Sequence, residues 1–213
     1  MANRIHLIPL FVLLGLSGCG RETPCPRCDT IVVAATGEPR SLLPPVVVET
    51  VGRDISDQIY ERLAELAPGA ASIDTSAYRP RLASSWERVD SVTLRFHLRL
   101  GARWQDGEPV TAADVVFSFE AFSDSAIDAQ ARPTLAGSVT ALAEDSNTVL
   151  IKFRRAYAEQ LYDATWHVRI IPAHIWKWIA RDMWAADTAV TRVVGSGPYR
   201  LTGWARGQSV TLE

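Results

Sequence analysis

The residue pair with the clearest potential for redox or metal chemistry is the CxxC formed by Cys25 and Cys28. A redox dithiol needs one cysteine at the start of a helix beside a βαβ unit, because the helix dipole lowers the pKa of that thiol. Here the pair lies in a proline-punctuated stretch ahead of an apolar run. A zinc site needs four ligands, and the sequence holds no second CxxC. We interpret the pair as a local disulfide or two idle thiols, and keep a thiol oxidoreductase as the less favoured alternative.

Other residue patterns typical of catalysis are missing from the sequence. It contains no phosphate-binding P-loop and no HExxH zinc motif. The tripeptide Gly195-Ser196-Gly197 is neither a dinucleotide-binding GxGxxG nor a GxSxG serine elbow. His167 and His174 are seven residues apart, so only the tertiary fold could bring both to one metal. We therefore expect no cofactor, no metal site and no enzymatic activity, and favour a binding function.

The charge balance argues against nucleic acid as a partner. The 213 residues carry 22 Lys and Arg against 24 Asp and Glu, a net charge of −2. Such a chain has no basic field to attract a phosphate backbone. Hydrophobic residues make up 47%, which is typical of a globular chain of one or two domains. The seven tryptophans all lie between Trp86 and Trp204, which indicates an aromatic-rich core or binding surface.

The first residues are typical of an export signal. Arg4 and His6 precede the apolar run 7–16, whose ten residues would rise about 15 Å as a helix, too short to cross a bilayer. Residues 16–19 read Leu-Ser-Gly-Cys and resemble the lipobox of bacterial lipoproteins, which is cut before the cysteine that receives the lipid. We therefore expect a signal peptide at 1–18, a lipid anchor on Cys19 and a tether at 19–29. An ordinary signal peptide is the alternative.

Apolar patterning predicts the elements of the first half of the chain. The β-branched run 30–35 predicts a buried strand, and apolar residues spaced by 4, 4 and 3 over 53–66 predict an amphipathic helix. Strict alternation over 92–100 predicts a half-buried strand. Asp106-Gly107 is typical of a tight turn.

The sequence of the second half of the chain predicts two hairpins, three helices and a further strand. Thr111 followed three residues later by an acid resembles a capping box and predicts the start of a helix. The remaining predictions are a hairpin at 139–142 and 148–153, a helix at 154–162, a strand at 166–171, a helix after Pro172, and a hairpin at 199–204 and 209–213. The sum is an α/β (mixed α+β) fold whose sheet is partly antiparallel.

Four segments in a fixed order resemble the extracellular solute-binding proteins of family 5, the oligopeptide- and dipeptide-binding kind that serve ABC importers. The segments are Asp57-Gln58-Ile59-Tyr60-Glu61-Arg62-Leu63, Arg81-Leu82-Ala83-Ser84-Ser85-Trp86-Glu87, the run 96–115 that contains Trp104-Gln105-Asp106-Gly107, and Val194-Gly195-Ser196-Gly197-Pro198-Tyr199. Together the resemblance covers nearly all of residues 30–213. The motifs identify a scaffold and carry little information about the ligand.

The resemblance implies a type II periplasmic binding protein-like fold, in which a ligand is enclosed between two lobes. It implies that 30–55 and 190–213 are parts of lobe I and that 56–189 is a small inserted domain. The loop after the first strand lines the cleft in this family, which assigns Val48, Glu49 and Thr50 to the ligand wall. Glu49 could pair with the ammonium group of a ligand, and a solvated loop acid is the alternative.

The resemblance also implies partners and a location. The partners would be a peptide or another small solute, a permease with its ATPase, and a membrane reached through the lipid anchor. The location would be the periplasm or the extracytoplasmic face of a bacterial membrane. The family also includes binders of nickel chelates, sugars and opines, so the ligand stays open.

Two features depart from the family pattern. Residues 41–44 read Ser-Leu-Leu-Pro where the family often has Ser-Leu-Asp-Pro, and the sequence ends at Glu213, before the second ligand-binding lobe. We therefore expect an N-terminal fragment of a binding protein with a partial fold. A short, non-transporting relative that acts as an interaction or chaperone-like module is the alternative.

Overall fold

A computed structural model describes residues 30–187 and 189–213, so the expected signal peptide, Cys19, Cys25 and Cys28 lie outside the described residues. Residues 35–213 form a compact unit. Residues 30–35 contain no helix and no strand, so the strand predicted there is wrong. An apolar β-branched run becomes a strand only where a neighbouring strand takes its hydrogen bonds, and no described strand is paired with it. Within the described residues, no helix has the length and apolar content needed to span a membrane.

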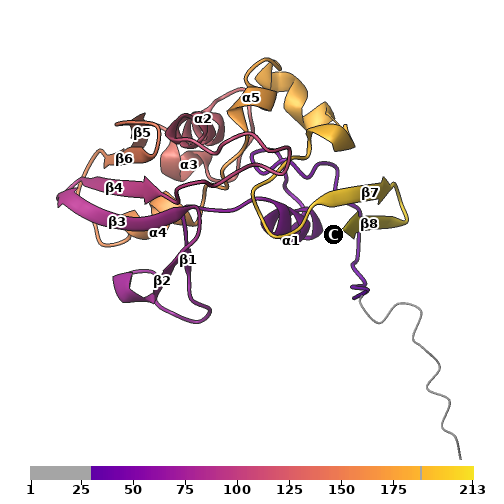
Figure 1. Cartoon of the computed structure of the whole chain (residues 1–213), viewed down its shortest axis with the longest axis horizontal. Coiled ribbons are helices and arrows are strands. Elements are labelled where there is room, and N and C mark those ends of the chain that lie inside the picture. The colour runs from indigo at the N-terminus through magenta and orange to yellow at the C-terminus, as the bar shows by residue number, and fades with distance from the viewer. Residues whose placement is uncertain (1–29, 188) are drawn as a thin grey trace, which may run out of the picture. The chain divides into compact units, whose positions relative to one another are not determined.

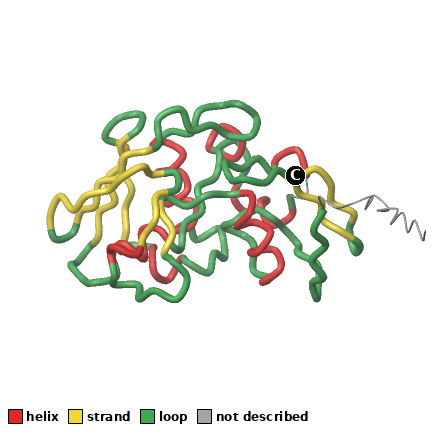
Figure 2. Tube along the Cα trace, turned by 60° about the horizontal axis from the view of Figure 1, so that its bottom comes forward, coloured by secondary structure: helices red, strands yellow, loops and turns green. Residues whose placement is uncertain are grey.

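A four-stranded antiparallel sheet forms one part of the 35–213 unit (Figures 1 and 2). Its spatial order is β3 (Ala83–Asp90), β4 (Thr93–Leu98), β6 (Thr148–Phe153) and β5 (Val139–Ala143). The alternation in β4 buries Leu94, Phe96 and Leu98, which confirms the predicted half-buried strand. The predicted β5–β6 hairpin is also confirmed, with Ala141 opposite Ile151.

Helix α2 (Ala112–Ser123) covers the β5–β6 side of this sheet, and the short α3 (Arg132–Leu135) packs beside it. Its start is confirmed, because the Asp114 carboxylate accepts the Thr111 backbone N–H at 2.8 Å. The other Asp114 oxygen accepts the N–H of Ala173 at 2.9 Å, at the beginning of α5 (Ala173–Trp176). One carboxylate therefore closes the first turn of α2 and attaches α5 to it.

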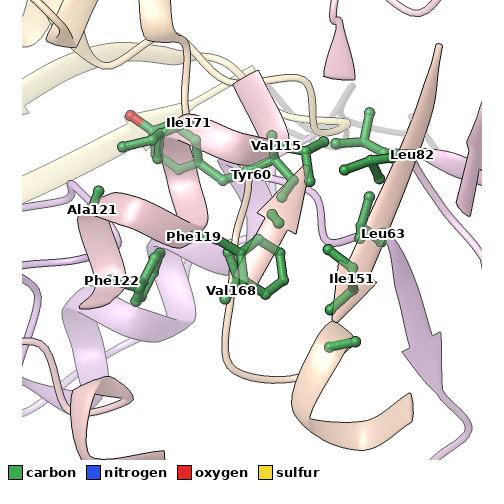
Figure 3. Packing of buried hydrophobic residues seen from close by; sticks show 14 of the residues in the cluster. Tyr60, Leu63, Leu82, Val115, Phe119, Ala121, Phe122, Ile151, Val168 and Ile171 are labelled. Carbon is green, nitrogen blue, oxygen red and sulfur yellow. The ribbon is translucent and has the colours of Figure 1, made fainter. Parts of the chain in front are cut away.

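The hydrophobic core lies between α2, the sheet and the segment after α1 (Figure 3). Figure 3 shows Tyr60, Leu63 and Leu82 packed near Val115 and Phe119 of α2. The tryptophan-rich stretch contributes to the core, as expected. Three of the seven tryptophans are almost fully buried: Trp104, Trp176 and Trp184.

Helix α1 (Thr50–Ile59) is shorter than the predicted helix at 53–66. The chain leaves the helix at Tyr60, and residues Ala64–Leu66 form β1, paired with β2 (Tyr78–Pro80) next to the short η1 (Thr75–Ala77). The carbonyls of Gln58 and Ile59, which a helix end leaves without partners, accept the N–H groups of Tyr199 and Gly197. These hydrogen bonds to residues far along the chain end the helix. The local spacing of apolar residues does not reveal them.

The C-terminal elements agree in part with the sequence. The helix predicted at 154–162 is displaced to α4 (Gln160–Thr165), and the strand predicted at 166–171 is absent. In that segment the N–H groups of Ile170 and Ile171 bond to the Glu61 carbonyl and the Ser118 hydroxyl instead of to a strand. After η2 (Arg181–Ala186) and η3 (Val190–Arg192), the predicted hairpin forms as β7 (Leu201–Ala205) and β8 (Ser209–Leu212).

Candidate functional site

The loop 38–50 leads into α1 and carries the three residues expected at the ligand wall. Val48 is 44% exposed, Glu49 is the N-cap of α1 and Thr50 is its first residue. Glu49 Oε1 lies 3.7 Å from Arg40 Nε, whereas Glu49 Oε2 is shielded from solvent and has no hydrogen-bond partner among the described residues. The positive end of the α1 dipole favours this carboxylate. Because only Oε1 lies near Arg40, the carboxylate can accept a hydrogen bond from a second donor.

Close packing holds this loop against α1. The Ser41 hydroxyl accepts the N–H of Leu43 at 3.1 Å, and the buried Ser56 hydroxyl donates to the Leu42 carbonyl at 3.2 Å. A Cβ on Gly52 would lie 2.5 Å from Val47 Cγ2. Only a glycine allows the helix and the loop to approach this closely.

The β7–β8 turn supports the loop from the other side. The guanidinium of Arg206 stacks on Trp204 at 3.5 Å from the ring centroid and donates to the Pro39 carbonyl at 2.9 Å. It also lies 3.8 Å from Glu38. Arg206 thus joins the hairpin to the beginning of the loop. Its position in a predicted turn gave no sign of this role, because its partners are more than 160 residues away in sequence.

A further arginine joins the start of α1 to the loop 124–131. Arg53 Nη2 donates to Thr50 Oγ1 at 3.4 Å, and Arg53 Nη1 donates to Gln130 Oε1. Both bonds are exposed. The sequence gave no signal for this pair either, since the two residues are 77 positions apart.

The segment 195–199 approaches the other end of α1. A Cβ on Gly195 would lie 1.8 Å from the Ile59 carbonyl oxygen, and one on Gly197 would lie 2.7 Å from the same atom. This motif therefore has a packing role at the C-terminal end of α1, as expected for a scaffold signature.

Titratable groups cluster beside α1 without forming a metal site. Arg62 and Arg169 both bind Asp57; burial raises the pKa of that carboxyl, but the two guanidiniums outweigh it and hold the pKa below the ordinary value of 3.8. Burial lowers the pKa of His167, whose Nε2 lies 3.3 Å from Asp163. Across residues 30–187 and 189–213 no group of three or more His, Cys, Asp or Glu could hold a metal ion.

Two open pockets lie elsewhere in the 35–213 unit. One of about 390 Å³ lies between the loop 66–72 and α4, where Tyr162 stacks on Trp166. The other, of about 430 Å³, lies at the ends of β3 and β4 beside His97. Neither is lined by Val48, Glu49 or Thr50. These two pockets therefore lie away from the expected ligand wall.

Comparison with known proteins identifies the scaffold. Residues 77–213 match the family model described as bacterial extracellular solute-binding proteins, family 5 Middle. A probable peptide-binding protein YejA from Agrobacterium fabrum is 32% identical over 200 residues, which cover 90% of this chain and 31% of that protein.

Two solved structures share the fold. The Haemophilus influenzae OppA complex with the peptide RPPGFSPFR has a TM-score of 0.70 at 23% identity and covers 83% of this chain and 36% of its own. MoaA from A. tumefaciens in complex with mannopinic acid has a TM-score of 0.63 at 32% identity, covering 80% of this chain and 34% of its own.

These matches confirm the expected mixed α/β, type II periplasmic binding protein-like fold in partial form. The chain spans about a third of the length of the relatives that it matches. The match extends over more than half of the chain and includes the turn at 104–107 and the glycine motif at 195–199. The chain belongs to the bacterial extracellular solute-binding proteins of family 5.

Proposed function

We propose that this chain is the N-terminal part of the substrate-binding component of an ABC-type importer. It captures peptides or related small solutes outside the cytoplasmic membrane and delivers them to a permease with its ATPase. The observation that carries this proposal is the family match over 77–213 on a fold shared with the peptide complex of OppA. The mannopinic acid complex of MoaA keeps opine-like solutes as a second ligand class.

We assign the ligand wall to Val48, Glu49 and Thr50. Glu49 supports a contact with a cationic ligand group, because its side chain is 28% exposed and a charge-assisted hydrogen bond suits an ammonium. The neighbouring Arg40 lies at 3.7 Å, too far for a strong hydrogen bond. The α-amino group of a peptide has the required charge.

The experiment is calorimetric titration of the chain with tripeptides that carry either a free or an acetylated N-terminus. Glu49→Gln is expected to weaken binding of the free-amine peptides about 10- to 150-fold, since a hydrogen bond to a charged group is worth about 1.5–3 kcal/mol. Acetylated peptides, which lack the ammonium, should bind both proteins equally.

The matched control is Glu65→Gln. Glu65 lies on β1, and its carboxylate forms an ion pair with Arg81. The substitution should leave both affinities unchanged. Equal losses for free and acetylated peptides would refute the ammonium contact. If the wild-type chain is folded but none of the added peptides produces a heat of binding, the peptide class of ligand is refuted.

We also propose that Cys19 carries a lipid, that 19–29 is a tether, and that 30–55 with 190–213 belongs to lobe I around the small domain 56–189. The lipobox-like residues 16–19 support the anchor.

Labelling with palmitate tests the lipid anchor. Bacterial cells that produce the chain should incorporate labelled palmitate into it, and Cys19→Ser should abolish the label. Cys28→Ser should retain it, and a labelled Cys19→Ser protein would contradict the proposal. For Cys25 and Cys28 our interpretation remains a local disulfide or two idle thiols.

A further inference from the structure

The turn 104–107 presents one half-buried side chain to a segment that lies about 90 residues further along the chain. The turn is closed by the N–H of Trp104 bonding to the Glu108 carbonyl at 2.8 Å and by that of Gly107 bonding to the Trp104 carbonyl at 2.9 Å. Gln105 stands at its tip, opposite residues 195–199. The sequence predicted this turn but assigned no role to Gln105.

Gln105 is hydrogen-bonded to this segment through both its backbone and its side chain. Its N–H donates to the Gly195 carbonyl at 2.9 Å, and its Oε1 accepts the Gly195 N–H at 3.1 Å. Its Nε2 donates to the carbonyls of Gly197 at 3.2 Å and Tyr199 at 2.7 Å. The side-chain amide thus uses its acceptor and both donors on one strip of backbone.

The backbone segment 195–199 leads directly into β7. Hydrogen bonds from the β7–β8 hairpin in turn reach the loop that carries the ligand wall. The carbonyl of Gln105 also accepts a bond from Arg200, immediately before β7. At the far end of the hairpin, Arg206 holds the carbonyls of Pro39 and Arg40 at the start of the loop 38–50. In Figure 1 the hairpin lies beside α1, to which this loop leads.

We propose that Gln105 is a positioning residue for the ligand wall. It fixes the base of the β7–β8 hairpin, and the hairpin in turn fixes the loop 38–50 through Arg206. The turn 104–107 and the ligand wall consequently move as one body. The assignment of the wall rests on the proposed function, whereas the coupling from Gln105 to the loop does not.

The test is hydrogen–deuterium exchange of the full chain with two substitutions at this residue. Gln105→Ala removes all three side-chain bonds. Gln105→Glu keeps an acceptor for the Gly195 N–H, but an ionised carboxylate faces the carbonyls of Gly197 and Tyr199 without a donor. At pH 7 both variants should raise exchange at least tenfold in β7, β8 and residues 40–47. The β4 and β6 amides should keep wild-type rates.

Acidification distinguishes positioning from a general loss of folding. At pH 4 the Gln105→Glu carboxyl becomes partly protonated and regains a donor, so its protection should return toward that of the wild type. The Gln105→Ala variant should show no such return. Wild-type protein at each pH corrects for the nearby Asp106–His174 pair. Gln208→Ala, which removes an exposed glutamine from the turn of the same hairpin, should change nothing.

Three results would overturn the proposal: unchanged exchange in both variants, faster exchange in the hairpin without any change at residues 40–47, or a uniform increase that includes β4 and β6 and persists at pH 4. Peptide titration of the same variants separates the two proposals. Wild-type protein that binds no peptide counts against the proposed function, while the exchange pattern alone decides the coupling.

Discussion

The backbone at Gly195 lies so close to the end of α1 that no side chain fits. We expect Gly195→Ala to destabilise the protein by about 3 kcal/mol, because a Cβ 1.8 Å from the Ile59 oxygen must push two backbone segments apart. Urea unfolding measures the effect. Gly203→Ala is the control, since its Cβ would meet Thr211 at an ordinary 3.7 Å. Similar losses at both positions would show that the close approach is not the cause.

Asp57 gives the clearest pH prediction at the residue scale. Its carboxylate binds Arg62 and Arg169, and its folded pKa lies below the ordinary value of 3.8. The stability that it contributes is therefore complete above about pH 4 and is lost as the pH falls through the folded pKa. Asp57→Asn should cost about 1–3 kcal/mol at pH 7, and the difference from wild type should shrink on acidification below pH 4.

Glu65→Gln is the matched control for this effect. Its ion pair with Arg81 has about half of each side chain in solvent, so its loss should cost at most about 0.5 kcal/mol. Urea unfolding at pH 7 and pH 3 measures both variants. If Asp57→Asn lowers the free energy of unfolding by the same amount at both pH values, the lowered pKa of Asp57 is contradicted.

At the scale of elements, those defined by local chemistry were predicted from the sequence. The β5–β6 and β7–β8 hairpins and the start of α2 depend on alternation, turn residues and a capping acid, all within a few residues. The predictions at 30–35 and 166–171 were wrong because a strand requires a partner that the local pattern does not reveal. At 166–171 the buried Val168 and Ile170 mimic a strand, but the backbone bonds go to a helix and a loop.

Asp114 is the side chain on which the start of α2 depends. Asp114→Ala removes three bonds, those from the N–H and hydroxyl of Thr111 and from the N–H of Ala173. We expect a loss of about 2–3 kcal/mol in urea unfolding. Asp114→Asn, which retains one acceptor oxygen, should lose about half as much. Equal losses in both variants would show that the charge, and not the set of bonds, stabilises this turn.

At the scale of the whole molecule, the scaffold was recognisable from the sequence, but the construction of the candidate site was not. Val48, Glu49 and Thr50 came from the resemblance alone. Arg206 contacts the start of their loop, and Gln105 contacts the segment before β7; the partners of both lie 90 or more residues away. No local pattern marks either residue for this role, because a tertiary hydrogen bond to a carbonyl can be made by any side chain with a donor that the fold brings there.

Hydrogen–deuterium exchange of the chain, with and without a tripeptide mixture at millimolar concentration, is the sharpest test of whether residues 48–50 contact a ligand. We expect slower exchange in residues 38–52, with the β3–β6 sheet unchanged. Protection that is concentrated instead at residues 66–72 and 159–166, around the pocket beside Trp166, or that is absent everywhere, would contradict the assignment of the ligand wall.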